Sequence, residues 1–156
     1  MARPEKGNQA PYFEGPNENG ETVSLDDFKG KKLILFFYPK DNTPGCTAAA
    51  CSLRDDYDTL RKHGFEMLGV SPDSPKKHTN FIEKHKFPFS LLADENKETL
   101  KAYGAWGRKK FMGREYDGVL RSTFIIDEDG KIMEVIDKVK TKKHAQQIMD
   151  LLNLND

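Results

Sequence analysis

The stretch "KLILFFYPKDNTPGCTAAAC", residues 32–51, joins a strand pattern to a helix pattern and contains both cysteines of the chain. Its first part is a continuous apolar run closed by Pro39, which is typical of a strand buried on both faces of a parallel sheet. Near Cys46 a helical pattern begins, which continues to about His63 and ends at Gly64. A buried strand that passes directly into a helix predicts an α/β fold.

The rest of the chain repeats this alternation of strands and helices. We expect strands at 65–73 and 89–94, helices at 75–85 (with Ser74 as N-cap) and 95–103, a hairpin over 119–138 turning at Asp129-Gly130, and a closing helix over 141–154 capped by Thr141. A short strand at 21–25 and a helical turn capped by Ser24 come before residue 32, and 105–118 is a polar, Gly-rich connection of unassigned form. The order β-α-β-α-β-α-β-β-α from residue 32 onward predicts a central mixed sheet flanked by helices, in a single domain over 1–156.

The composition argues against several kinds of partner. The 156 residues contain 25 Lys and Arg and 25 Asp and Glu, so no net field attracts nucleic acid or an anionic membrane. We interpret the basic clusters at 107–111 and 138–144 as solvated faces. The longest apolar run, 33–38, is too short to span a bilayer, and the first residues lack the apolar core of a signal peptide. We therefore expect a cytoplasmic protein with neither a nucleic-acid nor a membrane partner.

Cys46 stands where the buried strand passes into the helix, after "NTPG". Backbone N–H groups at a helix start are unpaired, and the helix dipole places partial positive charge there. Both effects favour the thiolate over the thiol, and the thiolate is the nucleophilic form of cysteine. The position of Cys46 therefore predicts a reactive thiol.

Cys51 lies five residues farther along the same predicted helix. Five residues turn the helix by about 140° beyond a full turn and separate the two Cα atoms by about 8.6 Å, whereas a disulfide needs about 4.4–6.8 Å. One helix face, which must pack on the sheet, carries Cys46, Ala50, Leu53, Tyr57 and Leu60. Two cysteines so placed either never bond, or bond only when the first turns of the helix unwind.

Other readings of these residues compete with redox chemistry. Cys51 alone fits a small buried residue, and Thr43 alone fits a helix N-cap. The four histidines, at 63, 78, 85 and 144, are scattered, and we expect them to face solvent rather than a metal. The two cysteines lack the ligand spacing of a zinc site, so we expect no metal and no cofactor.

The block "FFYPKDNTPGCT" resembles the peroxiredoxin family, and within it the bacterioferritin-comigratory-protein or Q-type branch. The resemblance extends to "GVSPDS", "LLAD" and "RSTFIID" and so covers most of the chain. It implies a thioredoxin fold with an N-terminal extension, and a thiol peroxidase that reduces hydrogen peroxide and organic hydroperoxides. It also implies recycling by thioredoxin or a similar dithiol reductant, and the Q-type branch is often monomeric.

The resemblance also assigns roles to five residues. It makes Cys46 the peroxidatic cysteine and Cys51 the resolving cysteine, which condenses with the Cys46 sulfenic acid before over-oxidation. Thr43 and Arg121 complete the catalytic site, and Pro39 shields the sulfur. Arg121 would donate hydrogen bonds to the peroxide oxygens, and the Thr43 hydroxyl would bond both peroxide and thiolate.

This chain departs from the family pattern at Ala49, where relatives usually carry an acidic residue. Two other functions stay open from the residues alone. A thioredoxin-type disulfide oxidoreductase would need a C-x2-C pair, and residue 49 is not a cysteine. A redox-sensing domain would use a Cys46–Cys51 disulfide as a conformational switch.

Overall fold

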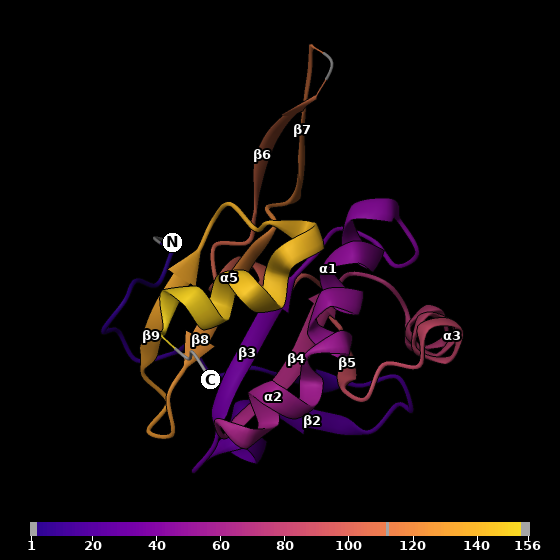
Figure 1. Cartoon of the computed structure of the whole chain (residues 1–156). Helices are drawn as coiled ribbons and strands as arrows, with labels where there is room; N and C mark the ends of the chain where they lie inside the picture. Colours follow the sequence, from indigo (N-terminus) through magenta and orange to yellow (C-terminus); the bar gives the residue numbers. More distant parts are fainter. Residues whose placement is uncertain (1–2, 112, 154–156) are drawn as a thin grey trace.

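The computed structural model describes residues 3–111 and 113–153, and its centre is a five-stranded mixed sheet in the order β5-β4-β3-β8-β9 (Figure 1). β3 pairs in parallel with β4, and β4 with β5, whereas β8 runs antiparallel to both β3 and β9. This arrangement confirms the predicted mixed sheet. The strands are β3 (Lys32–Phe37), β4 (Phe65–Ser71), β5 (Ser90–Ala93), β8 (Ser122–Ile126) and β9 (Ile132–Ile136).

Helices and the N-terminal segment cover the two faces of this sheet. One face packs against α1 (Pro44–Asp55), α2 (Tyr57–Lys62), α3 (Pro75–His85) and α5 (His144–Leu151), of which α1, α2 and α5 lie in front in Figure 1. The other face packs against α4 (Glu98–Ala102) and the N-terminal segment, which contains β1 (Glu14–Pro16), β2 (Thr22–Ser24) and the 3-10 turn η1 (Leu25–Phe28). Helices on both faces explain why β3 is apolar from Leu33 to Phe37.

Successive side chains of the apolar run alternate between two cores. Leu33, Leu35 and Phe37 pack into the core beside α4, and Ile34, Phe36 and Tyr38 into the core beside α1, α3 and α5. All six are at most 3% exposed. The strand therefore holds both layers together and ends directly before the loop that carries Pro39 and Thr43.

The predicted helix over 46–63 is two helices in the structure. α1 begins at Pro44, with Thr43 as N-cap, and ends at Asp55. Asp56 has φ −106° and ψ 18°, and α2 starts after it. Aspartate is a weak helix former, whose carboxylate competes for backbone groups, which favours a break at this point.

The predicted start of the C-terminal helix is wrong. Thr141 opens a 3-10 turn, η2 (Thr141–Lys143), and α5 begins only at His144, with Lys143 as its N-cap residue. The last predicted residue of this helix, 154, lies outside the described residues. Ser74, in contrast, caps α3 as predicted, because its hydroxyl accepts the backbone N–H of Lys77.

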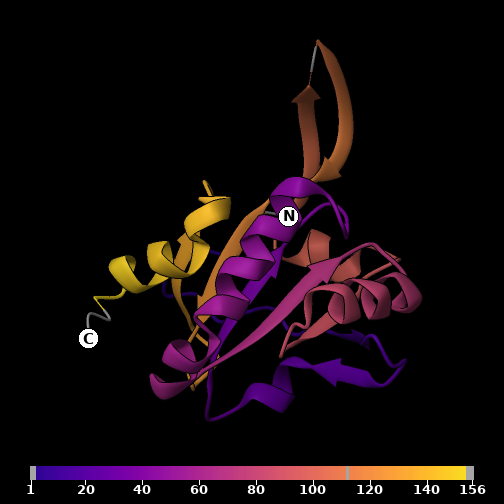
Figure 2. The ribbon, with the colours of Figure 1, turned by 45° about the vertical axis from the view of Figure 1, so that its right-hand side comes forward.

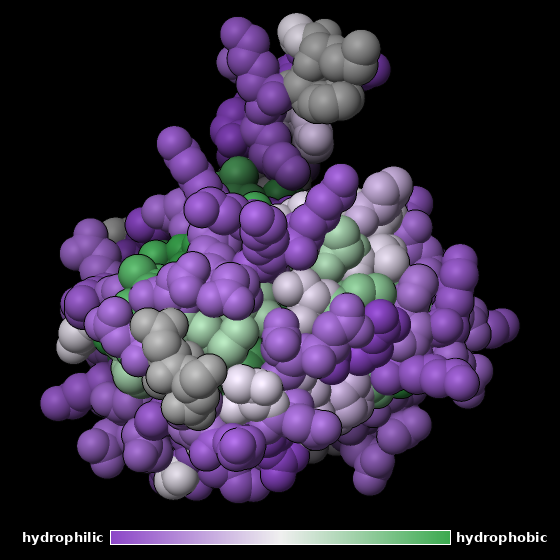
Figure 3. Space-filling view, viewed as in Figure 1, coloured by the Kyte–Doolittle hydropathy of each residue, from purple (hydrophilic) through white to green (hydrophobic). Residues whose placement is uncertain are grey.

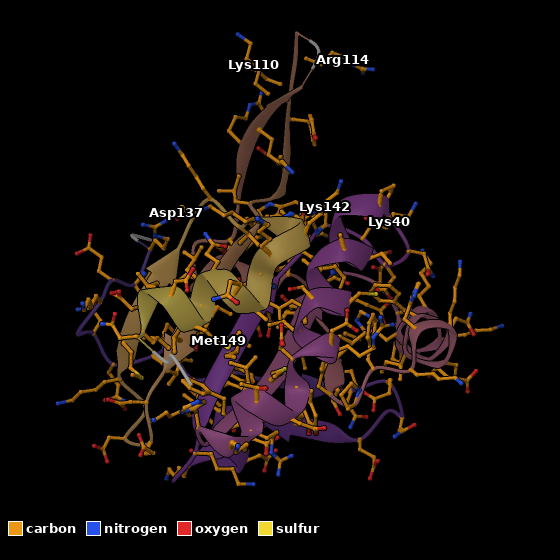
Figure 4. All side chains as sticks on the ribbon, in the orientation of Figure 1. Lys40, Lys110, Arg114, Asp137, Lys142 and Met149 are labelled. Atoms are coloured by element: carbon orange, nitrogen blue, oxygen red, sulfur yellow. The ribbon has the colours of Figure 1, made fainter. Side chains whose placement is uncertain are left out.

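The polar connection over 105–118 contains a hairpin that the sequence pattern did not reveal. β6 (Trp106–Phe111) and β7 (Arg114–Val119) pair antiparallel and stand away from the body of the molecule (Figures 1 and 2). Most of β7 is exposed, and Lys110 and Arg114 lie near the tip (Figure 4). A ribbon outside the core needs no apolar alternation, so the pattern of a half-buried strand is missing.

The face that carries α1 and α5 presents mostly hydrophilic side chains (Figure 3). Among the helices that the structure describes, none is both long enough and apolar enough to cross a bilayer.

Gly69 of β4 provides a test of the packing between the sheet and its helices. A Cβ at this position would lie 2.6 Å from Leu91 Cδ2 and 2.8 Å from Phe36 Cζ, both in the core. We expect Gly69→Ala to lower the free energy of unfolding by about 1–3 kcal/mol, the usual cost of overpacking a core. Urea denaturation measures this change.

The matched control is Gly107→Ala in β6, where an added Cβ meets only the Leu120 side chain, at 3.2 Å. We expect this change to alter stability by less than about 0.5 kcal/mol. Equal effects of the two substitutions would contradict the packing described for Gly69.

Candidate active site

Cys46 lies in the first turn of α1, close to the carboxyl end of β3. Its side chain is 2% exposed and packs in one core with Ala50 and Leu53 of the same helix. Tyr57 and Leu60 of α2 join this core in spite of the break between the helices. The predicted helix face is therefore confirmed, with a buried thiol at its N-terminal end.

Arg121, 75 residues from Cys46 in the sequence, places a positive charge beside the thiol. β3 pairs with β8 in a register that sets Phe37 opposite Ser122, so the residue before β8 lies at the carboxyl end of β3. Arg121 NH2 donates to Cys46 Sγ at 3.2 Å. Its NH1 is buried and has no hydrogen-bond partner within residues 3–111 and 113–153. One N–H group thus meets the sulfur, and a second donor stands unused beside it.

Gly45 leaves the room that this guanidinium occupies. A Cβ at Gly45 would lie 3.2 Å from Arg121 NH2 and 3.9 Å from Thr141 Cγ2. Such a contact is tight enough to push the guanidinium away by a few tenths of an ångström. The glycine before Cys46 is therefore needed for the close approach of Arg121.

Thr43 and Pro39 lie in the loop that joins β3 to α1. Thr43 takes the N-cap position, and its Oγ1 donates to the Lys40 carbonyl at 2.9 Å. The single hydroxyl hydrogen is thus bonded to Lys40, so the expected bond from Thr43 to the Cys46 sulfur is not made in this conformation, and the oxygen can still accept a bond. Pro39 is half-buried and follows Tyr38 directly.

A buried polar network anchors this loop to the sheet and to α3. The Asp41 carboxylate accepts from Tyr38 OH at 2.6 Å and lies 2.7 Å from His78 Nδ1. His78 Nε2 donates to the Leu92 carbonyl at 3.0 Å, and the Asp41 backbone N–H donates to Asp73 at 2.7 Å. Burial, together with the neighbouring Asp41 charge, raises the pKa of Tyr38 well above its ordinary value. The loop therefore has one well-defined position.

Cys51 lies one and a half turns farther along α1 and has different neighbours. Its Sγ is 3.9 Å from Nδ1 of His85 at the end of α3, whereas Cys46 contacts Arg121. Both cysteines are free. Burial raises the pKa of the Cys51 thiol, which the Arg54 charge opposes and the Asp55 charge reinforces. These contacts agree with the rotation of about 140° that helix geometry predicts between the two cysteines.

The expectation that the histidines face solvent is wrong for two of the four. His78 is 0% exposed and His144 1% exposed, while His63 and His85 are half-buried. The helical spacing contained the missing signal. His78 precedes Phe81 by three residues, and His144 precedes Ile148 by four, so both histidines share the apolar face of their helix.

His144 links α5 to both α1 and β8. Its Nδ1 donates to the Ala49 carbonyl at 3.3 Å, and the Thr123 hydroxyl donates to Nε2 at 2.9 Å, because the carbonyl can only accept. Burial lowers the pKa of His144 to about 4; the Ala49 bond opposes this shift and the Arg121 charge adds to it. A neutral His144 therefore holds α1 against α5 at neutral pH.

No three His, Cys, Asp or Glu side chains of the described residues converge in the way a metal site requires. The chemical groups that do converge are a thiol at a helix N-terminus and a guanidinium, and a second thiol follows in the same helix with its own neighbours. Together with the mixed sheet, they define a thiol-dependent redox protein of thioredoxin-like fold.

Comparison with known proteins identifies the family. The AhpC/TSA family model matches residues 6–135. Peroxiredoxin Bcp of Escherichia coli is 47% identical over 146 residues, which cover 94% of each chain. The chain belongs to the AhpC/TSA family and, within it, to the peroxiredoxins of the Bcp or Q type.

Solved structures agree with this assignment. A cysteine-to-serine mutant of Xylella fastidiosa PrxQ has a TM-score of 0.90 and 28% identity, covering 99% of this chain and 98% of that one. The bacterioferritin comigratory protein of Xanthomonas campestris, solved in work on its alkyl peroxide reduction activity, has a TM-score of 0.84 and 32% identity, covering 91% and 90%. The predicted thioredoxin fold of the peroxiredoxin type is confirmed.

The lowered pKa of His144 predicts how stability changes with pH. In the unfolded chain this histidine binds a proton near its ordinary pKa of about 6.5, but in the folded chain only near 4. Between these values the unfolded state binds more protons, so the free energy of unfolding falls as the pH falls. We expect a loss of about 3 kcal/mol from this group between pH 7 and pH 4.

Urea denaturation at a series of pH values measures this loss. His144→Asn retains a side-chain N–H donor for the Ala49 carbonyl but does not titrate, so its pH slope should be smaller by that amount. An unchanged slope in the variant would show that His144 does not carry the effect.

Proposed function

We propose that this protein reduces hydrogen peroxide and organic hydroperoxides, with Cys46 as the nucleophile. The Cys46 thiolate attacks the terminal peroxide oxygen, the O–O bond breaks, and hydroxide or an alkoxide leaves and takes up a proton from solvent to become water or an alcohol. Cys46 becomes a sulfenic acid. The family membership and the alkyl peroxide reduction activity of the Xanthomonas relative support this reaction class.

The position of Arg121 is the observation that carries the proposal. Its NH2 lies 3.2 Å from Cys46 Sγ and stabilises a thiolate, while its buried NH1 has no partner in the described structure. In the transition state negative charge spreads from the sulfur to both peroxide oxygens. A preorganised donor beside that charge lowers the barrier, and a desolvated guanidinium is a strong one.

Thr43 and Pro39 supply the remainder of the proposed site. Thr43 Oγ1 donates to the Lys40 carbonyl and so has lone pairs free to accept the hydroperoxide O–H. Pro39 has no backbone N–H, and its half-buried ring limits water around the sulfur. These two roles would orient the peroxide so that its terminal oxygen faces Cys46.

We propose that Cys51 resolves the sulfenic acid by forming a disulfide with Cys46. In an intact helix the two Cα atoms are about 8.6 Å apart, too far for a disulfide. The first turns of α1 must therefore unwind after oxidation. Ala49 lies in this segment and is buried, and its carbonyl accepts the His144 bond, so unwinding has to break that contact.

A dithiol protein of the thioredoxin kind would then reduce the disulfide by thiol exchange. Such a cycle suits a reducing compartment such as the cytoplasm. We also propose that 1–156 functions as one domain and as a monomer. The large apolar side chains exposed among the described residues are Tyr12, Tyr116 and Leu151, which lie in separate parts of the chain.

A redox sensor with the same disulfide is the alternative function. The two differ in the rate at which peroxide oxidises Cys46 and in whether a dithiol reductant sustains turnover. Stopped-flow mixing of the reduced protein with one equivalent of hydrogen peroxide measures the first step. A second-order rate constant no greater than that of a free thiol would rule out the peroxidase.

The two cysteines should have separable roles. We expect Cys46→Ser to abolish thioredoxin-dependent turnover, because no nucleophile remains. Cys51→Ser should still consume one peroxide per chain but should then accumulate sulfenic acid. Coupled peroxidase assays and mass spectrometry measure both results, and normal cycling of Cys51→Ser would exclude Cys51 as the resolving residue.

A substitution at Gly45, which lies close to Arg121, tests the role of the guanidinium without removing a reactive group. Gly45→Ala should displace the guanidinium by a few tenths of an ångström and slow Cys46 oxidation about tenfold, because catalytic rates are sensitive to such misplacement. Alanine favours the helix, so stability should not fall. Stopped-flow oxidation and urea denaturation check the two parts, and an unchanged oxidation rate would contradict the role of Arg121.

A further inference from the structure

The imidazole of His85 lies beside Cys51 in a fixed position. Its Nδ1 is 3.9 Å from Cys51 Sγ, at the long end of contacts to sulfur. The ring stacks on Phe87, with centroids 5.5 Å apart, and meets the ring of Phe81 edge-on at 5.4 Å. Arg54 of α1 donates to the His85 carbonyl at 2.8 Å. Two aromatic rings and one backbone bond thus set this imidazole against α1.

Burial keeps both groups of the pair neutral at pH 7, and some of the neighbouring charges reinforce it. Burial lowers the pKa of His85, and the positive charges of Lys84 on α3 and Arg54 on α1 lower it further. Burial raises the pKa of Cys51, where Arg54 acts in the opposite direction and Asp55 reinforces the rise. The resting pair is therefore a thiol beside an unprotonated imidazole.

A thiol in this state cannot resolve a sulfenic acid quickly, because the attacking species is the thiolate. An imidazole with its proton on Nε2 presents a lone pair at Nδ1, the nitrogen nearest to Cys51 Sγ. A neutral imidazole is a good general base near pH 7.

We propose that His85 is the general base of the resolving step. This inference rests on the proposed function, in which Cys51 attacks the Cys46 sulfenic acid. The Cys51 proton passes to His85 Nδ1, the new thiolate attacks the Cys46 sulfur, and the S–O bond breaks as the S–S bond forms. The departing hydroxide takes up a proton from the imidazolium and leaves as water. The Cys51 sulfur is oxidised and the sulfenic sulfur reduced, so no other reactant is needed.

The Arg54 contact allows His85 to act as the base while the first turns of α1 unwind. Arg54 lies three residues beyond Cys51 and ties the second half of the helix to the end of α3. Unwinding of the first turns can bring Cys46 toward Cys51 while Cys51 stays beside His85. The base and its thiol therefore remain together when the disulfide forms.

The alternative role for His85 is packing between Phe81 and Phe87. Two variants separate this role from that of a base. His85→Phe retains an aromatic ring for the stack but cannot accept a proton, and His85→Gln retains polarity without a basic nitrogen. Glu83→Gln, on an exposed position of the same helix, is the matched control.

The experiment is a single turnover of the reduced full chain with one equivalent of hydrogen peroxide, quenched at intervals and analysed by mass spectrometry. It reports Cys46 oxidation and disulfide formation as separate steps, between pH 5 and pH 10. In the wild type and in Glu83→Gln, the disulfide rate should level off near pH 7, as His85 becomes fully neutral, and should rise again only where free Cys51 thiolate reacts faster than the assisted pair. In both His85 variants it should be at least about tenfold slower at pH 7. Above pH 7 the disulfide rate of the two His85 variants should rise about tenfold per pH unit until the pH reaches the pKa of Cys51.

Three results would overturn the inference: unchanged disulfide rates in both His85 variants, a uniform loss with an unchanged pH profile, or a loss in His85→Gln that His85→Phe does not share. Cys46 oxidation should be the same in all the proteins. If the wild type itself oxidises no faster than a free thiol, the proposed function fails. If it oxidises fast and the His85 variants resolve normally, only the role of His85 fails.

Discussion

The contact between Arg121 and Cys46 depends on one feature of the sheet, the antiparallel pairing of β3 with β8. β3 carries the chain into the loop before α1, and the register that sets Phe37 opposite Ser122 places Arg121 beside the start of that helix. Cys46 lies at the N-terminus of α1, where the helix dipole favours a thiolate, and Arg121, directly before the neighbouring strand β8, supplies the positive charge. A shift of this register by one residue would move Arg121 away and turn the β8 side chains to the other face.

Hydrogen bonds hold α1 on two sides, and only some of them must break when the first turns of the helix unwind. On one side His144 donates to the Ala49 carbonyl, and the Ala145 N–H to Ser52 Oγ. On the other side Arg54 donates to the carbonyl of the last residue of α3. The bond from His144 to Ala49 lies within the segment that must open for the cysteines to meet, whereas the bonds of Ser52 and Arg54 lie beyond Cys51. Such an arrangement lets one end of a helix open while the other stays docked.

Much of the site could be predicted because its information is local. The strand-to-helix transition, the thiol at the helix start and the helix face all follow from residues within about twenty positions of one another. The β6–β7 hairpin could not be predicted, because a ribbon outside the core carries no apolar period. The helical spacing of His78 and His144 indicates their burial, but the groups that bond the two buried rings, Asp41 and Thr123, are distant in sequence and could not be predicted from it.

The sequence by itself determined the mixed α/β sheet, the placement of Cys46 at a helix start and the impossibility of a Cys46–Cys51 bond within an intact helix, since each follows from local periodicity and helix geometry. The family resemblance named Arg121, but only the tertiary structure shows the contacts that bring Arg121 to Cys46 and His85 to Cys51. Arg121 is 75 residues from Cys46 and His85 is 34 from Cys51. Contacts over such distances depend on strand register and helix packing, which a pattern along the chain does not encode.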